Sequence, residues 1–331
     1  MAHLVARLWE TELVEVHPTR DYGLVRKLAS MAPRVRGPRG PLLVIAAHPG
    51  DLLALADARV LLGRVGQVGA WIIDSFWDER LPRFAREGST IDRVWITDHE
   101  LVDRYRDRTG IECGWAPWGS DALDWPGVRG SAGPGSDGRD VDVLRLGRQP
   151  AAWADDDVNR ALFEERGLTY QGTFVGSQTD GLANQREVVR QLSRTKVVLA
   201  SGNLASPADY THPTRDYLTG RFTDAVTCGA LVAGSLPKVR AADLLPDEAK
   251  VEIDVSSRGA GLAAIEAAVA SWSPDLERRL RHHALVHLDW RHRVRDISEA
   301  LGVVTPTLTA ELARLDHEVA VAGAAAGKGC A

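Results

Sequence analysis

The chain has 331 residues, of which 44% are hydrophobic and 26% are charged, and its formal net charge is −5. This is the composition of a folded globular protein and argues against a disordered chain, while the length favours two domains. A net negative charge argues against a broad electrostatic footprint for nucleic acid, so we expect no nucleic-acid partner.

The cysteines and the N-terminal segment give indications of the cellular compartment. Cys113, Cys228 and Cys330 are far apart in the sequence and form neither a disulfide framework nor a metal clip, which favours a reducing compartment. No apolar run reaches the roughly 18 residues that a membrane span needs, and Arg7 and Glu10 lie where a signal peptide would be apolar. We expect a cytoplasmic protein without a membrane span, of undetermined oligomeric state.

The first half alternates short apolar runs with polar or amphipathic segments. Helices are predicted at Ala54–Leu62 and Glu100–Arg108, and strands at Leu42–Ala47, Ala70–Ile73, Arg93–Thr97 and Cys113–Pro117. Strands separated by helices indicate right-handed βαβ crossovers and a parallel sheet.

A stretch rich in Gly, Pro and Ser, residues 125–140 (WPGVRGSAGPGSDGRD), predicts a linker, and beyond it the pattern restarts. Strands are predicted at Val141–Leu146, Tyr170–Val175, Lys196–Ala200 and Ala230–Gly234, and helices at Asp155–Arg166, Asn184–Arg194 and Phe222–Cys228.

The expected fold class is α/β, with two Rossmann-like doubly wound domains facing a central cleft. The expected domains are residues 1–124 and 141–275. Helices in 276–318, including Leu276–Leu288 and Arg291–Leu301, can cross back to the first domain, and a flexible tail follows from 319 to 331.

The stretch richest in candidate ligand-binding residues is Ser201–Gly229 (SGNLASPADYTHPTRDYLTGRFTDAVTCG). Gly220 allows close backbone approach at a helix start, where free N–H groups attract an anion, and Arg221 adds a permanent charge. Thr219 can donate a hydroxyl. Asp224, one turn into the helix, can accept both hydrogen bonds of a ribose cis-diol. For Asp224 alone, an ordinary helix-start carboxylate is the better interpretation. Together, these residues favour a nucleoside diphosphate pocket.

A second candidate for the diphosphate follows the strand Val141–Leu146. Gly147-Arg148-Gln149 places a glycine and a guanidinium at a strand's carboxyl end, which suits a diphosphate. A surface ion pair of Arg148 explains the same residues equally well.

The half from Asp140 to Gly234 resembles the nucleotide-binding domain of GT-B glycosyltransferases, in particular the CgeB-like group and the retaining family with an E-x7-E motif. Asp216 and Asp224 have the spacing of those two acids, with Asp in place of Glu, and residues 224–229 (DAVTCG) resemble the family's EAMACG. Arg221 matches the arginine before the helix acid in the CgeB-like group. Residues 117–121 (PWGSD) are similar to the segment that closes the family's first domain.

The resemblance implies that the first half binds an acceptor. His48 and Asp74 follow successive predicted strands, and either can serve as the base that an inverting transfer needs. Further polar candidates at strand ends are Asp51, Asp78, Asp98, His99 and Glu100.

Two alternatives remain. Residues 47–51 (AHPGD) resemble the AHPDDE signature of zinc-dependent sugar N-deacetylases, so His48 and Asp51 are candidate zinc ligands, although Gly50 replaces that family's base. The other alternative is a non-catalytic protein that binds a nucleotide sugar.

The sequence therefore predicts a glycosyltransferase with a nucleoside-diphosphate sugar as donor, UDP-glucose by family frequency, and a hydroxyl of a small acceptor such as a nucleoside or another specialised metabolite. Arg148, Thr219, Gly220 and Arg221 would neutralise the diphosphate, Asp224 would hold the ribose, and Asp216 would complete the donor site by resemblance. Because arginines supply the charge, we expect no cofactor and no metal.

Overall fold

The computed structural model describes residues 1–16, 36–56, 62–82, 90–125, 139–173 and 180–327. The chain forms two compact units. The first consists of Met1–Trp118 and Arg291–Leu312, and the second of Gly119–Trp290 and Ala313–Ala331.

The first unit contains a four-stranded parallel sheet in the order β1-β2-β3-β4. Its strands are β1 (Leu42–Ala46), β2 (Val68–Ile72), β3 (Arg93–Ile96) and β4 (Glu112–Trp115). All four predicted strands are thus confirmed. Each connection runs to the neighbouring strand, so the carboxyl ends lie along one edge, where polar side chains can gather.

Glycines on both sides of Trp95 make room for its indole on one face of this sheet. A Cβ built at Gly69 of β2 or at Gly114 of β4 would lie within 3 Å of the indole, at 2.8 and 2.7 Å. Leu301 covers the same face, 3.0 Å from the position of a Cβ on Gly69, and it ends the helix α10 (Trp290–Leu301).

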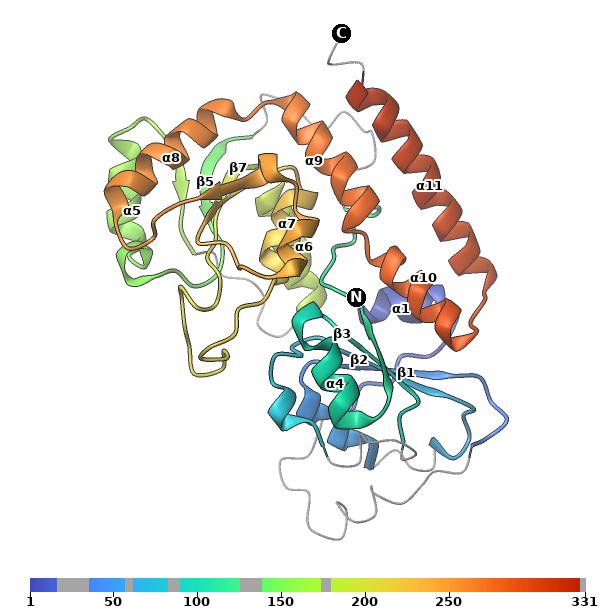
Figure 1. Cartoon of the computed structure of the whole chain (residues 1–331). Helices are drawn as coiled ribbons and strands as arrows, with labels where there is room; N and C mark the ends of the chain where they lie inside the picture. The colour runs from blue at the N-terminus through green and yellow to red at the C-terminus, as the bar shows by residue number, and fades with distance from the viewer. Residues whose placement is uncertain (17–35, 57–61, 83–89, 126–138, 174–179, 328–331) are drawn as a thin grey trace. The chain divides into compact units, whose positions relative to one another are not determined.

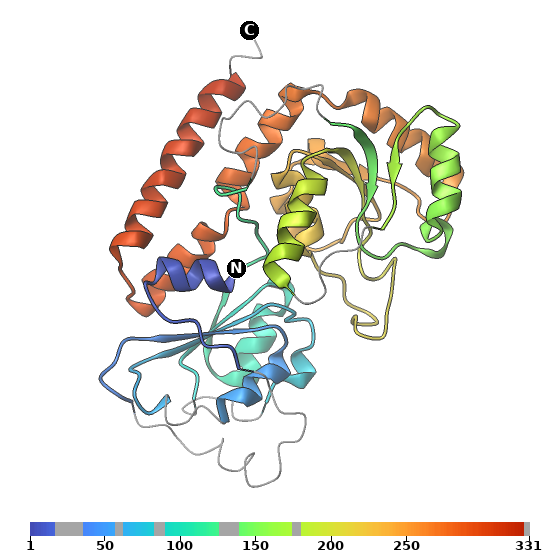
Figure 2. The ribbon, with the colours of Figure 1, turned by 180° about the vertical axis from the view of Figure 1, so that it is seen from behind.

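Helices cover both faces of this first sheet. α1 (Ala2–Leu8) lies beside α10, and the indole N–H of Trp9 donates to Ser298 Oγ at 2.8 Å. α4 (Val102–Thr109) lies on the opposite face (Figures 1 and 2). The unit is therefore a three-layer α/β sandwich.

The second unit contains a five-stranded parallel sheet in the order β6-β5-β7-β8-β9. Its strands are β5 (Val141–Arg145), β6 (Tyr170–Gln171), β7 (Thr195–Leu199), β8 (Leu231–Gly234) and β9 (Lys250–Glu252). In chain order this is the doubly wound order 2-1-3-4-5, in which the direction of winding reverses between β5 and β7. Ligands of such sheets bind at that switch point, outside the carboxyl ends of the two strands.

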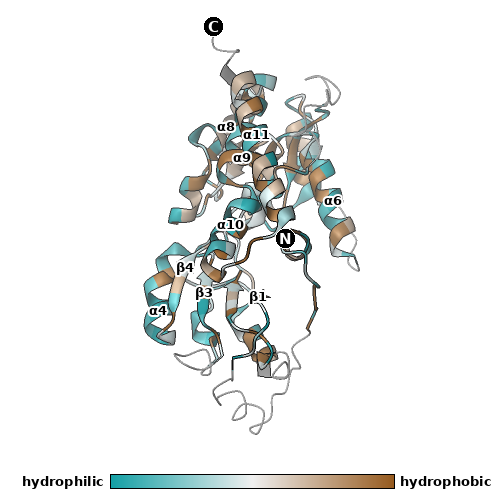
Figure 3. Cartoon of the chain, turned by 90° about the vertical axis from the view of Figure 1, so that its right-hand side faces the viewer, coloured by the Kyte–Doolittle hydropathy of each residue, from teal (hydrophilic) through white to brown (hydrophobic). Residues whose placement is uncertain are grey.

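Helices also cover both faces of the second sheet (Figure 1). α5 (Asp156–Glu164) and α8 (Arg258–Ser271) lie on one face, and α6 (Gly181–Leu192) and α7 (Gly220–Thr227) on the other. Asp155 and Asp180 cap α5 and α6 by accepting two backbone N–H groups each. Figure 3 shows hydrophobic and hydrophilic residues along α6, whose Val189 and Leu192 are buried. Together the two units confirm the expected pair of Rossmann-like α/β folds.

A buried arginine joins three elements of the second unit. Arg139 lies just before β5 and donates to the backbone carbonyls of Leu192, Thr195 and Cys228. Its guanidinium also lies 3.2 Å from Glu277 of α9 (Pro274–His287). Three carbonyls at the ends of α6, β7 and α7 are thereby satisfied by one side chain.

Three predicted elements differ in the structure. The strand expected at Tyr170–Val175 covers only Tyr170–Gln171 among the described residues. The helix expected at Ala54–Leu62 is a 3₁₀ helix at Pro49–Ala56, and residues 57–61 lie outside the described part. Residues 319–327 of the expected flexible tail belong to α11 (Pro306–Gly327), because alanine, the residue with the highest helix propensity, dominates residues 320–326. The predicted linker falls mostly on residues 126–138, outside the described residues.

Within the described ranges, no helix combines the length and the apolar character that crossing a membrane requires.

Candidate functional site

Two loops and one helix start meet at the switch point of the second sheet. After β5 the chain turns at Gly147, whose φ of 78° lies in the left-handed region that glycine adopts at little cost. After β7 a loop of residues 200–219 leads to α7, which begins at Gly220. The Gly147 turn contacts α7 directly, since a Cβ on Gly147 would lie 3.0 Å from Nη1 of Arg221.

The loop after β7 holds the guanidinium of Arg148. Its Nε donates to the carbonyl of Ser206 at 3.1 Å, and its Nη2 donates to Oδ1 of Asn203 at 3.1 Å. Tyr210 accepts from Nη1 and places its ring 4.5 Å from the guanidinium carbon. All these partners are neutral, so the surface ion pair considered from the sequence does not form among the described residues.

Arg221 lies against Gly147, the residue before Arg148, and both arginines are partly buried. Its Nη1 donates to the carbonyl of Ser201 at 3.2 Å. Burial lowers the pKa of Arg221, and the neighbouring charge of Arg148 lowers it further. Within the described part of the chain, no carboxylate forms an ion pair with either guanidinium. The charge of Asp216 opposes that shift without forming an ion pair, so the two guanidiniums keep a positive charge that can attract an anion.

The start of α7 adds hydrogen-bond donors to this pair. Thr219 is the N-cap residue, yet its hydroxyl does not cap the helix. This hydroxyl is buried and has no hydrogen-bond partner among the described residues. Such an atom is costly unless a ligand or water pairs with it. The first backbone N–H groups of α7 follow Thr219 directly, and the helix dipole favours negative charge at this end of the helix.

Asp216 organises the loop from within. Its Oδ1 accepts the backbone N–H of Asn203 and of Tyr217, each at 3.1 Å. Burial raises the pKa of Asp216, although these backbone hydrogen bonds oppose the shift. Asp216 thus fixes the backbone of Asn203, which in turn accepts from Arg148.

Asp224 follows Arg221 by one helical turn and has its own hydrogen-bond donors. Ser120 donates its hydroxyl to Oδ1 at 2.7 Å, and Gln185 of α6 donates to Oδ2 at 3.4 Å. Burial raises the pKa of Asp224 to about 7. The structure therefore places Arg148, Thr219, Gly220 and Arg221 together, and Asp224 one turn away among different partners.

A second polar cluster lies in the first unit, at the carboxyl ends of β1 and β2. Nδ1 of His48 is 3.7 Å from Oδ2 of Asp74, and it is buried without a hydrogen-bond partner among the described residues. Asp51 fixes the turn by accepting the N–H of His48 at 2.9 Å. Burial raises the pKa of Asp74, and the nearby His48 opposes that shift. An imidazole nitrogen and a carboxylate at this distance are groups that can take up a proton from an acceptor hydroxyl.

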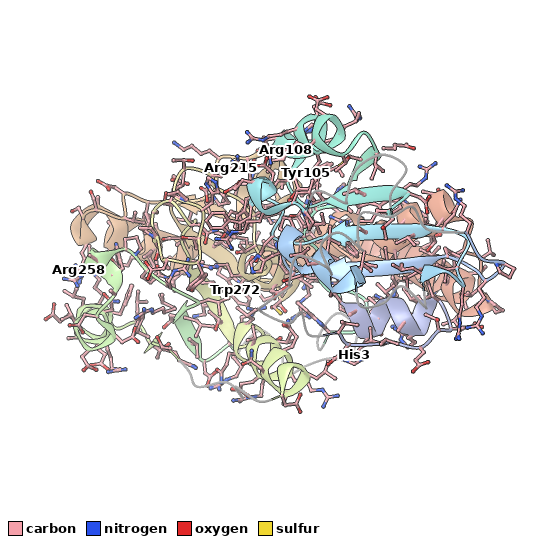
Figure 4. The ribbon with its side chains drawn as sticks, turned by 90° about the horizontal axis from the view of Figure 1, so that it is seen from below. His3, Tyr105, Arg108, Arg215, Arg258 and Trp272 are labelled. Atoms are coloured by element: carbon pink, nitrogen blue, oxygen red, sulfur yellow. The ribbon has the colours of Figure 1, made fainter. Side chains whose placement is uncertain are left out.

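The other polar candidates of the first unit pair with neighbours. Asp78 is fully buried and contacts Arg104 and Arg108. Asp98 accepts the hydroxyl of Ser75 at 2.7 Å, and the carbonyl of Ser75 accepts from Tyr105. Tyr105 and Arg108, labelled in Figure 4, both lie on α4. These contacts attach α4 to the loops that follow β2 and β3.

No group of three His, Cys, Asp or Glu side chains that would suit a metal ion occurs among the described residues. The alternative of a zinc hydrolase needs a third protein ligand beside His48 and Asp51. The described part of the chain does not bring one to them.

Sequence reasoning missed the residues that hold the predicted ones in place. Asn203 and Tyr210 stand in the loop after β7, so that loop's position at a strand's carboxyl end was a usable signal. Ser120 and Gln185 carry no such signal, because they reach Asp224 only through the tertiary fold.

No family model and no curated protein matches this sequence. Among solved structures, a glycosyltransferase from Rickettsia africae is similar over 88% of this chain and 84% of its own, at 10% identity and a TM-score of 0.50. HepE from Anabaena, solved with UDP, covers 79% of each chain at 12% identity and a TM-score of 0.46. Sucrose-phosphate synthase from Thermosynechococcus elongatus covers 78% of this chain and 72% of its own, at 13% identity and a TM-score of 0.47. At such identities the likeness to the Rickettsia protein shows the fold alone, which is that of two Rossmann-like domains.

Proposed function

We propose that this chain is a glycosyltransferase of the GT-B type that takes its sugar from a nucleoside diphosphate sugar. One observation carries the proposal: the Gly147–Arg148 turn and Arg221 meet at the switch point of the second sheet, and neither guanidinium has a carboxylate ion-pair partner among the described residues. The fold adds to it, because the similar Rickettsia africae structure is that of a glycosyltransferase.

Different residues of the donor site would bind the diphosphate and the ribose. Arg148, Arg221, the Thr219 hydroxyl and the Gly220 helix start would bind the diphosphate, whose negative charge grows as the sugar leaves. Asp224 would accept the hydroxyls of the ribose. Asp216 would hold the loop that carries Asn203. The resemblance to the CgeB-like group and to the E-x7-E motif supports these roles, and UDP-glucose remains our preferred donor.

The proposed glycosyl transfer involves no oxidation or reduction. An acceptor oxygen bonds to the anomeric carbon, the bond from that carbon to the diphosphate oxygen breaks, and the nucleoside diphosphate leaves with the electron pair. The acceptor's proton would pass to Asp74 or His48 in an inverting transfer. The arginines would stabilise the leaving group without a metal ion. The acceptor that we propose is a small hydroxylated metabolite.

The test is a thermal-shift panel with UDP, GDP, ADP and dTDP. A ligand at 100 times its Kd stabilises the folded state by about 2.7 kcal/mol, so the correct nucleotide raises the melting temperature. Arg221→Gln should remove the response by leaving the diphosphate one charge-assisted partner short. Arg160→Gln, on the exposed side of α5, is the matched control and should retain it. A folded wild-type protein that responds to none of the four nucleotides would refute the proposal.

A further inference from the structure

The segment that precedes the second sheet supplies a fixed hydroxyl to α7. Ser120 donates to the carbonyl of Leu288 through its N–H at 2.8 Å, and its own carbonyl accepts from Trp290 at 3.0 Å. Gly119 packs so closely that an added Cβ would lie 2.4 Å from the Leu288 carbonyl oxygen. The backbone of Ser120 is thus held on both sides, and its hydroxyl has little freedom to move.

That hydroxyl meets Asp224 at 2.7 Å, the shorter of the two hydrogen bonds that the carboxylate accepts. The Ser120 oxygen also lies 3.1 Å from the hydroxyl of Thr223, which itself contacts the carbonyls of Gly119 and Gly220 at 3.1 and 3.2 Å. Ser120 has one hydroxyl proton, for which Thr223 and Asp224 are both acceptors, and the shorter contact and the charge of the carboxylate favour Asp224.

The two hydrogen bonds from Ser120 and Gln185 leave acceptor sites on the Asp224 carboxylate unoccupied. A carboxylate has about four lone-pair sites, and Ser120 and Gln185 occupy one on each oxygen of Asp224. The remaining sites, one on each oxygen, are the pair that a cis-diol requires. Because each oxygen of Asp224 accepts a hydrogen bond, the carboxylate is held in one orientation and its remaining lone pairs keep a fixed direction.

We propose that Ser120, supported by Gln185, is a positioning residue that orients Asp224 toward the ribose hydroxyls of the nucleotide and thereby makes the site selective for ribonucleotides. This inference rests on the proposed donor site. It adds to that site two residues that never touch the diphosphate.

The experiment compares the affinities of UDP and 2′-deoxy-UDP, or the corresponding pair for the base that the panel selects, by calorimetry. At pH 8, where Asp224 is ionised, wild-type protein should prefer the ribonucleotide by about tenfold or more, as expected for one or two hydrogen bonds to a charged acceptor. Ser120→Ala should weaken UDP binding about tenfold and leave 2′-deoxy-UDP nearly unchanged, which removes the preference. Ser120→Thr keeps the hydroxyl and should restore the preference.

Controls separate positioning from folding. Gln185→Ala, on a partly exposed helix position, should reduce the same preference by a smaller factor because its contact is longer. Ser271→Ala removes a hydroxyl from the end of α8 and should change neither affinity. If Ser120→Ala and Gln185→Ala both keep the wild-type ratio of affinities, the inference is wrong while the donor site stands. If wild-type protein binds no nucleotide, both fall.

Discussion

Gly147 and Arg221, 74 positions apart in the sequence, touch at the carboxyl edge of the second sheet. A Cβ on Gly147 would lie 3.0 Å from Nη1 of Arg221. The glycine has a positive φ, so it both turns the chain after β5 and leaves the space that the guanidinium occupies. The absence of a side chain at Gly147 therefore determines the position of the Arg221 guanidinium.

Gly147→Ala should therefore weaken nucleotide binding by displacing Arg221. Gly167→Ala is the matched control, because Gly167 has a φ of 70° and no atom within 4 Å of an added Cβ. Both variants should lose about 1 kcal/mol of stability from backbone strain, but only Gly147→Ala should raise the Kd for the nucleotide, about tenfold or more. Equal Kd values for the two variants, measured by calorimetry, would contradict this view of the turn.

Asp224→Asn should stabilise the protein in a pH-dependent way. The unfolded chain ionises this carboxyl near its ordinary pKa of 3.8, whereas burial raises the pKa in the folded state to about 7. Between these values the folded state holds the extra proton, so wild-type stability falls as the pH rises from 4 to 7. The asparagine variant avoids that cost.

The gain for Asp224→Asn should be about 2 kcal/mol at pH 8 and should shrink toward zero near pH 4, after allowance for the partial exposure of the side chain. Urea denaturation at four pH values measures it. The same variant should lose nucleotide affinity, since an amide offers fewer acceptor sites to a diol. A pH-independent difference in stability would show that the carboxyl is ionised normally in the folded protein.

Asp74→Asn should lower kcat and leave the Kd for the nucleotide unchanged, because Asp74 belongs to the first unit and the donor residues to the second. Loss of a general base typically costs about 10²- to 10⁴-fold in rate. Asp103→Asn, on an exposed position of α4, is the control and should keep wild-type turnover. If Asp74→Asn keeps full activity, either His48 is the base or the transfer is a retaining one.

Arg139→Met should destabilise the second unit strongly. The methionine fills space but leaves three backbone carbonyls and Glu277 without their shared donor. Removing one partner of a buried charged network costs about 3–5 kcal/mol, whereas an exposed pair contributes at most about 1 kcal/mol. Arg194→Ala breaks the exposed pair with Asp140 and provides the comparison. Similar midpoints in urea for the two variants would refute the assigned role of Arg139.

Local patterns in the sequence predicted most of the strands and helices. Apolar runs such as residues 70–72 and 231–234 are strands in the structure, because a strand buried on both faces needs a continuous apolar segment. The alternation with helices determined the parallel sheets. The prediction of a flexible tail was wrong for residues 319–327, because the high helix propensity of alanine extends α11 to Gly327.

For the candidate site, the sequence by itself determined which chemical groups stand at strand ends and helix starts, because those positions follow from the local pattern of α7 and β5. Only the tertiary structure decided their partners: Arg221 against Gly147, Ser120 on Asp224, and His48 facing Asp74. Such contacts join residues tens to more than a hundred positions apart. They depend on strand order and on packing, which no local pattern of residues encodes.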